Sequence, residues 1–133
     1  MQLTVGKLAA AGGVGVETIR YYQRRGLMGT PARSGGDGWG AGIRRYDAED
    51  VRRLKFIRAA QGAGFTLEEI GELLALEAGD DRVQVRRLAR RRIEALDARI
   101  AQMTETRAAL ARLADQCAAN DKGPCPILAA FEP

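Results

Sequence analysis

The segment VETIRYYQRRGL, residues Val16–Leu27, decides the fold class of this 133-residue chain. Ile19 and Tyr22 stand three residues apart, a spacing that places both side chains on one face of a helix. Gly26 occupies the position at which a C-cap glycine commonly ends a helix. The segment therefore predicts a short helix over Val16–Arg25 that packs on a neighbour through its apolar face.

The residues on either side of this helix extend the motif. Upstream, apolar residues recur at helical spacing over Leu3–Ala10, and the pair Gly12–Gly13 interrupts them. Two short helices with a glycine-containing turn between them are typical of a helix-turn-helix. Downstream, Gly29–Gly42 is a glycine-rich loop, and Ile43–Tyr46 predicts a short strand. The loop and the strand together predict a wing beside the helix-turn-helix.

Two further helices follow, each with a signal at its start. Asp47 is a favourable N-cap for a helix over Ala48–Gln61. Thr66 and Glu69 have the spacing of a capping box, in which each side chain bonds the other residue's backbone N–H. We therefore expect a second helix to begin at Thr66.

A much longer helix is predicted over Val83–Gln116, which contains neither glycine nor proline. It exceeds the length of a typical globular helix. Its apolar residues alternate three and four apart, the spacing of a coiled-coil seam. The seam positions are Ile93, Leu96, Ile100, Met103, Arg107, Leu110 and Ala114. A coiled coil with a second copy, parallel or antiparallel, would bury this stripe, and packing on the chain's own N-terminal part is the alternative.

Charge is unevenly distributed along the chain. Residues 1–58 hold 11 Lys/Arg and 5 Asp/Glu, whereas residues 59–133 hold 10 and 12. A basic N-terminal part is the electrostatic footprint of phosphate binding, and a solvated surface is the other interpretation. The sequence shows neither a membrane-spanning run nor a signal peptide. We therefore expect a cytoplasmic location, where disulfides are rare.

Cys117 and Cys125 are the two cysteines, separated by seven residues that include Gly123 and Pro124. Such a loop allows both thiolates to converge on one ion, and thiolates select soft ions such as Cu(I), Ag(I), Au(I) and Hg(II), or Zn(II) and Cd(II). Zinc takes about four ligands, and the chain has no histidine and no third cysteine. Two thiolates alone suit a linear, two-coordinate ion.

The sequence also allows functions other than the binding of a soft metal ion. A thiol-based redox sensor would use a Cys117–Cys125 disulfide and would need no metal. A drug-sensing regulator would carry a substantial ligand domain, but little sequence follows Cys125. We expect no enzymatic activity, because the sequence offers no histidine, no nucleophile–base pair and no phosphate-binding loop.

These motifs resemble, in order, those of MerR regulators. Val16–Leu27 resembles the family's recognition helix, Ile43–Tyr46 its wing, and Gly64–Ile70 the linker before its dimer helix. The resemblance covers nearly the whole chain and is strongest to the metal-sensing branch, particularly the mercury and copper regulators. One departure is the loop Ser34–Ala41, which is longer and richer in glycine than in the family and carries Trp39.

The resemblance implies a mainly α fold with three parts. These are a winged helix-turn-helix DNA-binding domain with linker helices (1–77), a dimerisation helix that forms an antiparallel coiled coil (78–116), and a metal-binding loop with the C-terminal segment (117–133). The implied partners are a second copy, an inverted repeat in promoter DNA, and RNA polymerase at that promoter. Metal binding would then bend and untwist the DNA.

The resemblance also implies which residues contact DNA. Arg20 and Tyr22 would act from the recognition helix, and others would hold backbone phosphates, although Tyr22 and Tyr46 have a core role as an alternative. The expected DNA-binding residues are Thr18, Arg20, Tyr21, Tyr22, Arg33, Arg44, Tyr46 and Arg58.

Cys117 and Cys125 are the expected metal ligands. In the family's mercury and zinc or cadmium sensors, a further cysteine comes from the start of the partner's long helix, and the matching position here is about Arg82. The seven-residue spacing resembles the copper and gold regulators, whereas Cys125–Leu128 resembles the mercury regulators. With two thiolates alone, we expect Cu(I), Ag(I) or Au(I) first and Hg(II) as a close second.

Overall fold

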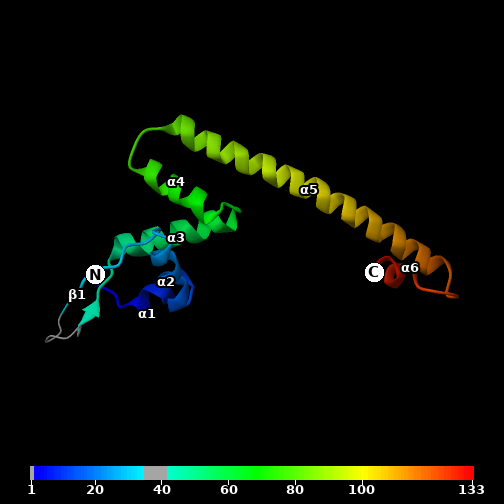
Figure 1. Cartoon of the computed structure of the whole chain (residues 1–133), viewed down its shortest axis with the longest axis horizontal. Helices are drawn as coiled ribbons and strands as arrows, with labels where there is room; N and C mark the ends of the chain where they lie inside the picture. The colour runs from blue at the N-terminus through cyan, green and yellow to red at the C-terminus, as the bar shows by residue number, and fades with distance from the viewer. Residues whose placement is uncertain (1, 35–41) are drawn as a thin grey trace. The chain divides into compact units, whose positions relative to one another are not determined.

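The computed structural model describes residues 2–34 and 42–133 (Figure 1). By their internal contacts these residues divide into two compact units, one that ends at Leu88 and one that begins at Ala89. The described elements are mainly helical, as expected. The domain boundaries after residues 77 and 116 remain predictions.

The first unit begins with the predicted helix-turn-helix. Helix α1 spans Val5–Gly12 and helix α2 spans Val16–Arg24. Between them, Gly13 has a φ of 68°, a left-handed conformation that glycine adopts without steric cost. Helix α1 begins later than the apolar pattern suggested, because Leu3 forms a backbone bridge with Tyr46.

The wing is a two-stranded antiparallel ribbon. Strand β1 spans Arg33–Ser34 and strand β2 spans Ile43–Arg44, with Arg33 opposite Arg44. The predicted strand over Ile43–Tyr46 is thus confirmed in part, with Tyr46 bridged to Leu3 at its end. The greater part of the unusual loop, residues 35–41 including Trp39, lies outside the described residues.

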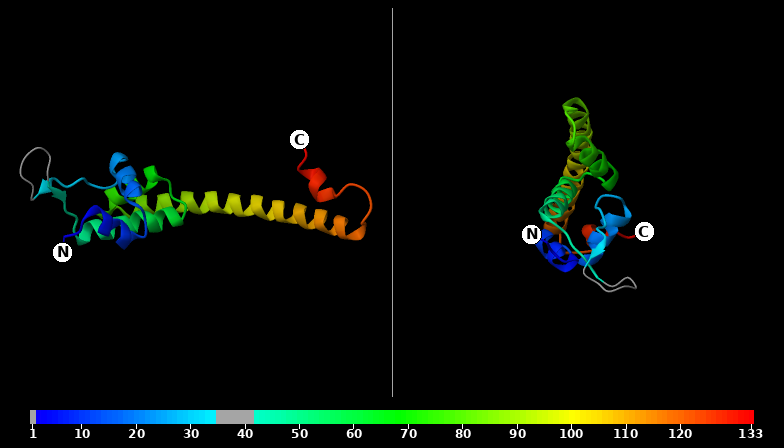
Figure 2. Two further views of the ribbon diagram at one scale, coloured as in Figure 1. Left: turned by 90° about the horizontal axis from the view of Figure 1, so that it is seen from below. Right: turned by 90° about the vertical axis from the view of Figure 1, so that its left-hand side faces the viewer.

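Both predicted caps are present on the helices that follow. Helix α3 spans Ala48–Gly62 and has Asp47 as its N-cap. Helix α4 spans Leu67–Glu77, and Thr66 and Glu69 form the expected capping box. Helix α1 packs on α2 and α3, and α4 packs on α3 (Figure 2). The core contains Leu8, Ile19, Tyr22, Tyr46, Leu54, Ile57 and Ile70, among others.

The contact of α1 with α3 depends on the absence of a side chain at Gly12. A methyl group there would overlap Leu54 Cδ2 and lie 2.7 Å from Leu54 Cγ, and Leu54 is fully buried. We expect Gly12→Ala to lower the free energy of unfolding by about 1–3 kcal/mol, as overpacking does. Gly6→Ala in the same helix meets nothing within 4 Å.

Urea denaturation of the two variants measures this difference. Gly6→Ala should be neutral or stabilise the protein by up to about 1 kcal/mol, because alanine has the higher helix propensity. Equal midpoints for Gly12→Ala and Gly6→Ala would show that α1 and α3 do not pack as closely as described.

Two helices form the C-terminal part of the chain. Helix α5 spans Arg82–Ala119, in agreement with the long helix predicted, and helix α6 spans Pro126–Ala130. Apolar seam residues of α5 in the second unit are exposed in the single chain: Ile93 (54%), Leu96 (39%), Ile100 (60%), Met103 (61%) and Leu110 (41%).

Among the described residues, no helix combines the length and the apolar character needed to cross a membrane.

Candidate DNA interface and thiol pair

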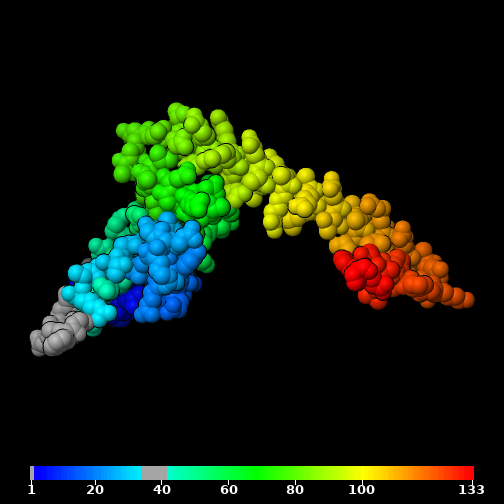
Figure 3. Space-filling view, viewed as in Figure 1, coloured from blue at the N-terminus to red at the C-terminus, as the bar shows by residue number. Residues whose placement is uncertain are grey.

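Helix α2 lies between two surface hollows of the first unit. One has a volume of about 280 Å³ and is lined from α2 by Arg20 and Gln23. The other has a volume of about 450 Å³ and is lined from α2 by Glu17, Thr18 and Tyr21, among others. Figure 3 shows the α2 region, in blue, at the surface of this unit. The eight residues expected to contact DNA all line one hollow or the other.

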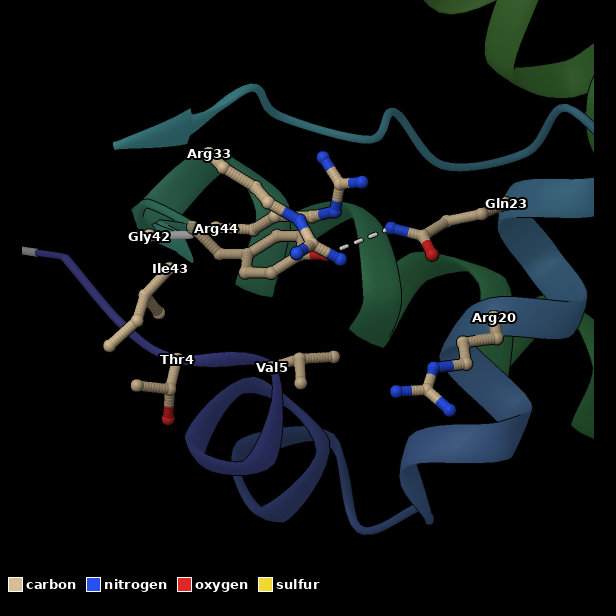
Figure 4. Close-up of a pocket in the computed structure, with 9 residues that line it drawn as sticks. Thr4, Val5, Arg20, Gln23, Arg33, Gly42, Ile43 and Arg44 are labelled. Atoms are coloured by element: carbon tan, nitrogen blue, oxygen red, sulfur yellow. Dashed lines mark hydrogen bonds between the residues drawn. The ribbon is translucent and has the colours of Figure 1, made fainter. Parts of the chain in front are cut away.

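Three guanidinium groups line the first hollow. Arg20 comes from α2, Arg33 from β1 and Arg44 from β2, and Figure 4 shows the three side chains directed toward the same space. Arg44 Nη1 donates to the Pro31 carbonyl at 2.7 Å, and Arg20 Nη1 pairs with Glu17 at 3.0 Å. The structure thus places arginines from helix and wing on one surface of concentrated positive charge, which suits a phosphate backbone.

Tyr21 is the centre of a second basic cluster, beside the other hollow. Tyr21 is 39% exposed, and its hydroxyl accepts a hydrogen bond from Arg25 Nη1 at 3.0 Å. The guanidinium carbons of Arg24 and Arg25 lie 5.9 and 5.8 Å from the ring centroid, within cation–π range. Arg58 of α3 lines the same hollow. This cluster offers cations and one hydroxyl to a ligand.

Tyr22 and Tyr46 belong to the hydrophobic core. Each is 2% exposed, and each hydroxyl has a partner within the protein. Tyr22 donates to Gln61 Oε1, and Tyr46 accepts from Gln23 Nε2 at 2.9 Å. Their burial favours the core role left open by the sequence, so our DNA-contact proposal retains Thr18, Tyr21 and the arginines and gives these two tyrosines a supporting role.

Gln23 is a residue that the sequence did not single out. Its amide donates to the Tyr46 hydroxyl at 2.9 Å and to the Gly29 carbonyl at 3.1 Å, and so ties α2 to the chain on either side of the wing. The dashed line at Gln23 in Figure 4 marks one of these bonds. Its place one helical turn after Arg20 was the available signal. Gln23 thereby holds the chain just before and just after the wing against α2, the helix that carries Arg20.

We expect Gln23→Leu to weaken DNA binding about 10-fold, because two hydrogen bonds worth about 1 kcal/mol each are lost from the support of the wing. Fluorescence anisotropy with a labelled DNA duplex measures the effect. Tyr46→Phe removes only the acceptor and should weaken binding less.

The double variant separates support from direct contact. If Tyr46 acts only through Gln23, Tyr46→Phe should have no further effect in the Gln23→Leu protein. Fully additive losses would instead assign the Tyr46 hydroxyl its own contact with DNA.

Cys117 and Cys125 lie together in the second unit. Cys117 is in the last turns of α5, and Cys125 is the N-cap residue of α6. The chain reverses between them (Figures 1 and 2), with Gly123 at a φ of 85°. The two sulfurs are 3.8 Å apart, and both residues are partly exposed. The predicted convergence of the two thiols is present.

The two thiols differ in acidity. The hydrogen bond between the two sulfurs raises the pKa of Cys117 because it stabilises the protonated thiol, and repulsion between two adjacent thiolates raises it further. Backbone N–H groups of Leu128 and Ile127 lower the pKa of Cys125 by stabilising its thiolate. Cys125 is therefore the first of the pair to ionise as pH rises.

The pair suits a soft metal ion by donor type and separation. With bonds of about 2.3 Å, sulfurs lie about 3.8 Å apart on a tetrahedral ion and about 4.6 Å apart on a linear one. The observed 3.8 Å thus matches a bent S–metal–S arrangement. For a linear arrangement, the two sulfurs would have to move apart by about 0.8 Å. Within the described ranges, no three His, Cys, Asp or Glu residues gather as a metal site.

A helix-turn-helix with a paired-strand wing and arginines on both sides of its second helix defines the class of DNA-binding regulators. The sequence pattern described as "MerR HTH family regulatory protein" matches residues 3–77, and that described as "MerR, DNA binding" matches residues 51–113. The chain belongs to the MerR family.

Individual relatives span nearly the whole chain. A mercuric resistance operon regulatory protein of Pseudomonas fluorescens is 39% identical over 131 residues, which cover 98% of this chain and 88% of that protein. The structure is similar to MerR from Bacillus megaterium MB1 in complex with mercury(II), with 31% identity, a TM-score of 0.68, and coverage of 97% and 98%. It is also similar to PbrR691 from Ralstonia metallidurans CH34 in complex with lead(II), with 28% identity, a TM-score of 0.74, and coverage of 98% and 99%.

Proposed function

We propose that the chain is a homodimeric transcription regulator that binds promoter DNA and responds to a soft metal ion held by Cys117 and Cys125. The observation that carries the metal response is the 3.8 Å separation of the two sulfurs. Family membership and the arginine-lined hollows support the DNA-binding part.

DNA binding is assigned to the surface of α2 and the wing. Arg20 and Thr18 would reach base edges or phosphates from α2, whereas Arg33, Arg44 and Arg58 would contact phosphates; all five line the two hollows. Phosphate contacts release counterions, so the affinity should fall steeply as salt concentration rises. Base contacts from α2 would supply sequence preference.

Dimerisation is assigned to the α5 seam. Its apolar side chains are exposed in the single chain, although coiled-coil seams are stable only when a second helix covers them. A second copy supplies an identical stripe, and we propose the antiparallel arrangement. The twofold axis of such a dimer requires an operator with inverted half-sites.

We place Hg(II) ahead of Cu(I), Ag(I) and Au(I) as the inducing ion. The 39% identical relative is a mercuric resistance regulator, and the structural neighbour from Bacillus megaterium MB1 holds mercury(II). The two thiolates suit Hg(II) and Cu(I) alike, so the sulfur chemistry alone does not order them. Arg82, at the first position of α5, provides no thiolate.

The response itself is proposed to be a change in DNA shape. When bound, the ion supplies a cross-link between two thiolates, which fixes the end of α5 to the start of α6. Cys117 and Cys125 would thereby favour one of two protein conformations, and the favoured one would bend and untwist the promoter. In such a promoter, the two elements that RNA polymerase recognises would lie too far apart to be engaged together. The change in DNA shape would realign them, and RNA polymerase would then engage both.

Competition titration of the reduced protein with Hg(II), Cu(I) and Zn(II) tests this function. We expect Hg(II) and Cu(I) to bind one ion per thiol pair in the presence of a thiol competitor that keeps Zn(II) unbound. Tight Zn(II) binding together with weak Hg(II) and Cu(I) binding would contradict a site of two thiolates.

A further inference from the structure

The thiol pair has the geometry of a redox couple as well as that of a metal site. The sulfurs are 3.8 Å apart, and a disulfide bond measures about 2.05 Å, so less than about 2 Å of closure is needed. The residues between them, Ala118–Pro124, are all exposed, and Gly123 provides a left-handed turn. Neither sulfur is locked in the hydrophobic core.

We propose that Cys117 and Cys125 close to a reversible intrachain disulfide with low-molecular-weight disulfides of the glutathione class, and that closure withdraws the pair from metal binding. The second half rests on the proposed metal site, whereas closure of the pair does not. The chain contains no other thiol, so the pair has no competing partner within one chain.

The chemistry is two successive thiol–disulfide exchanges. In the first, one cysteine thiolate attacks a sulfur of the small disulfide, whose S–S bond breaks and releases one thiolate that takes a proton from water. In the second, the other cysteine thiolate attacks the protein sulfur of the mixed disulfide and releases the second small thiol. Two protein thiols are oxidised, and one small disulfide is reduced to two thiols.

Closure and metal binding exclude one another, because soft ions bind thiolates and a disulfide has none. By linkage, a bound ion lowers the tendency of the pair to oxidise by the same factor by which oxidation lowers the affinity for the ion. The thiol–disulfide balance of the surroundings would therefore set the concentration of metal at which the protein responds. A disulfide between two partly exposed cysteines is accessible to the small thiols that reduce it.

The test exposes the reduced full-length protein to graded mixtures of reduced and oxidised glutathione, followed by acid quenching and intact-mass measurement. We expect loss of two hydrogens per chain, migration as a single chain without reductant, and reversal by dithiothreitol. A glutathione adduct that persists in the wild-type chain, or a disulfide between chains, would overturn the proposal.

Two variants and one ligand complete the experiment. Cys117→Ser and Cys125→Ser each retain one thiol and should stop at the glutathione adduct, which the wild type resolves. Protein preloaded with Hg(II) should resist oxidation, and oxidised protein should take up no Hg(II) until it is reduced. Uptake of Hg(II) by the oxidised chain would overturn the proposed exclusion.

The same samples distinguish disulfide closure from metal binding, because the two are measured separately. Reduced protein that takes up no Hg(II) but closes its disulfide would contradict the metal sensor and leave the redox couple standing. Reduced protein that binds Hg(II) but never closes the disulfide would contradict the redox couple alone.

Discussion

Serine in place of Cys117 is expected to weaken Hg(II) binding by at least about 100-fold, because even the groups that support a metal ligand contribute up to about that factor. One of the two thiolates is lost, and a neutral hydroxyl is a poor ligand for a soft ion. Metal-dependent transcription should disappear, while DNA binding without metal should be unchanged. Metal competition and in vitro transcription measure the two effects.

The matched control is Ala118→Ser, which adds a hydroxyl beside Cys117 in the same exposed turn of α5. It should retain both metal affinity and response. Cys125→Ser should behave as Cys117→Ser does. If either serine variant still responds fully to Hg(II), Cys117 and Cys125 are not the ligands of the inducing ion.

Aspartate in place of Ile100 is expected to separate the dimer and to weaken operator binding by about 100-fold or more. Ile100 is 60% exposed in the single chain and is one of the inner positions of the seam. Covered by a second helix, an aspartate there would be a buried, unpaired charge. Loss of the dimer also removes the effective concentration that joins two half-site contacts, a factor of about 10²–10⁴.

Ala98→Asp is the control, because it adds the same charge to the same helix at an exposed position outside the seam. Sedimentation velocity should show a dimer for Ala98→Asp and a monomer for Ile100→Asp. Affinity for a single half-site should be equal in the two variants, since the first unit is untouched. A dimeric Ile100→Asp protein would rule out the seam as the dimer interface.

Local signals predicted the helices well. Asp47 and Thr66 start helices in the structure because their side chains satisfy backbone N–H groups within three residues of themselves. The length of α5 could also be predicted from the sequence, because no glycine or proline interrupts the helix between Val83 and Gln116. Such features depend on neighbours in sequence and therefore need no knowledge of the fold.

Features that depend on distant residues were less accessible. The bridge between Leu3 and Tyr46, which precedes α1 and follows β2, joins segments more than forty residues apart. The role of Gln23 depends on where folding places the Gly29 carbonyl and the Tyr46 hydroxyl. The burial of Tyr22 and Tyr46 was left open for the same reason. A tyrosine that is close to arginines in the sequence can either pack in the core or contact a DNA phosphate.

The candidate metal site was predicted in its ligands but not in its geometry. Cysteine spacing and the nearby glycine and prolines indicated convergence of Cys117 and Cys125. The 3.8 Å separation, which lies closer to a bent than to a linear pair, depends on how α6 begins after the turn. The choice of ion was similarly beyond a count of thiolates, because Hg(II) and Cu(I) accept the same two donors.

The decisive measurement asks whether Hg(II) at Cys117 and Cys125 changes the shape of bound DNA. It is chemical-nuclease footprinting of the protein on an operator selected from random duplexes, with and without one equivalent of Hg(II) per thiol pair. We predict that the protein remains bound in both states and that Hg(II) makes the operator centre hypersensitive to cleavage. The Cys117→Ser, Cys125→Ser double variant should give the metal-free pattern throughout. A wild-type footprint that Hg(II) leaves unchanged, or a change that persists without the two cysteines, would contradict the account.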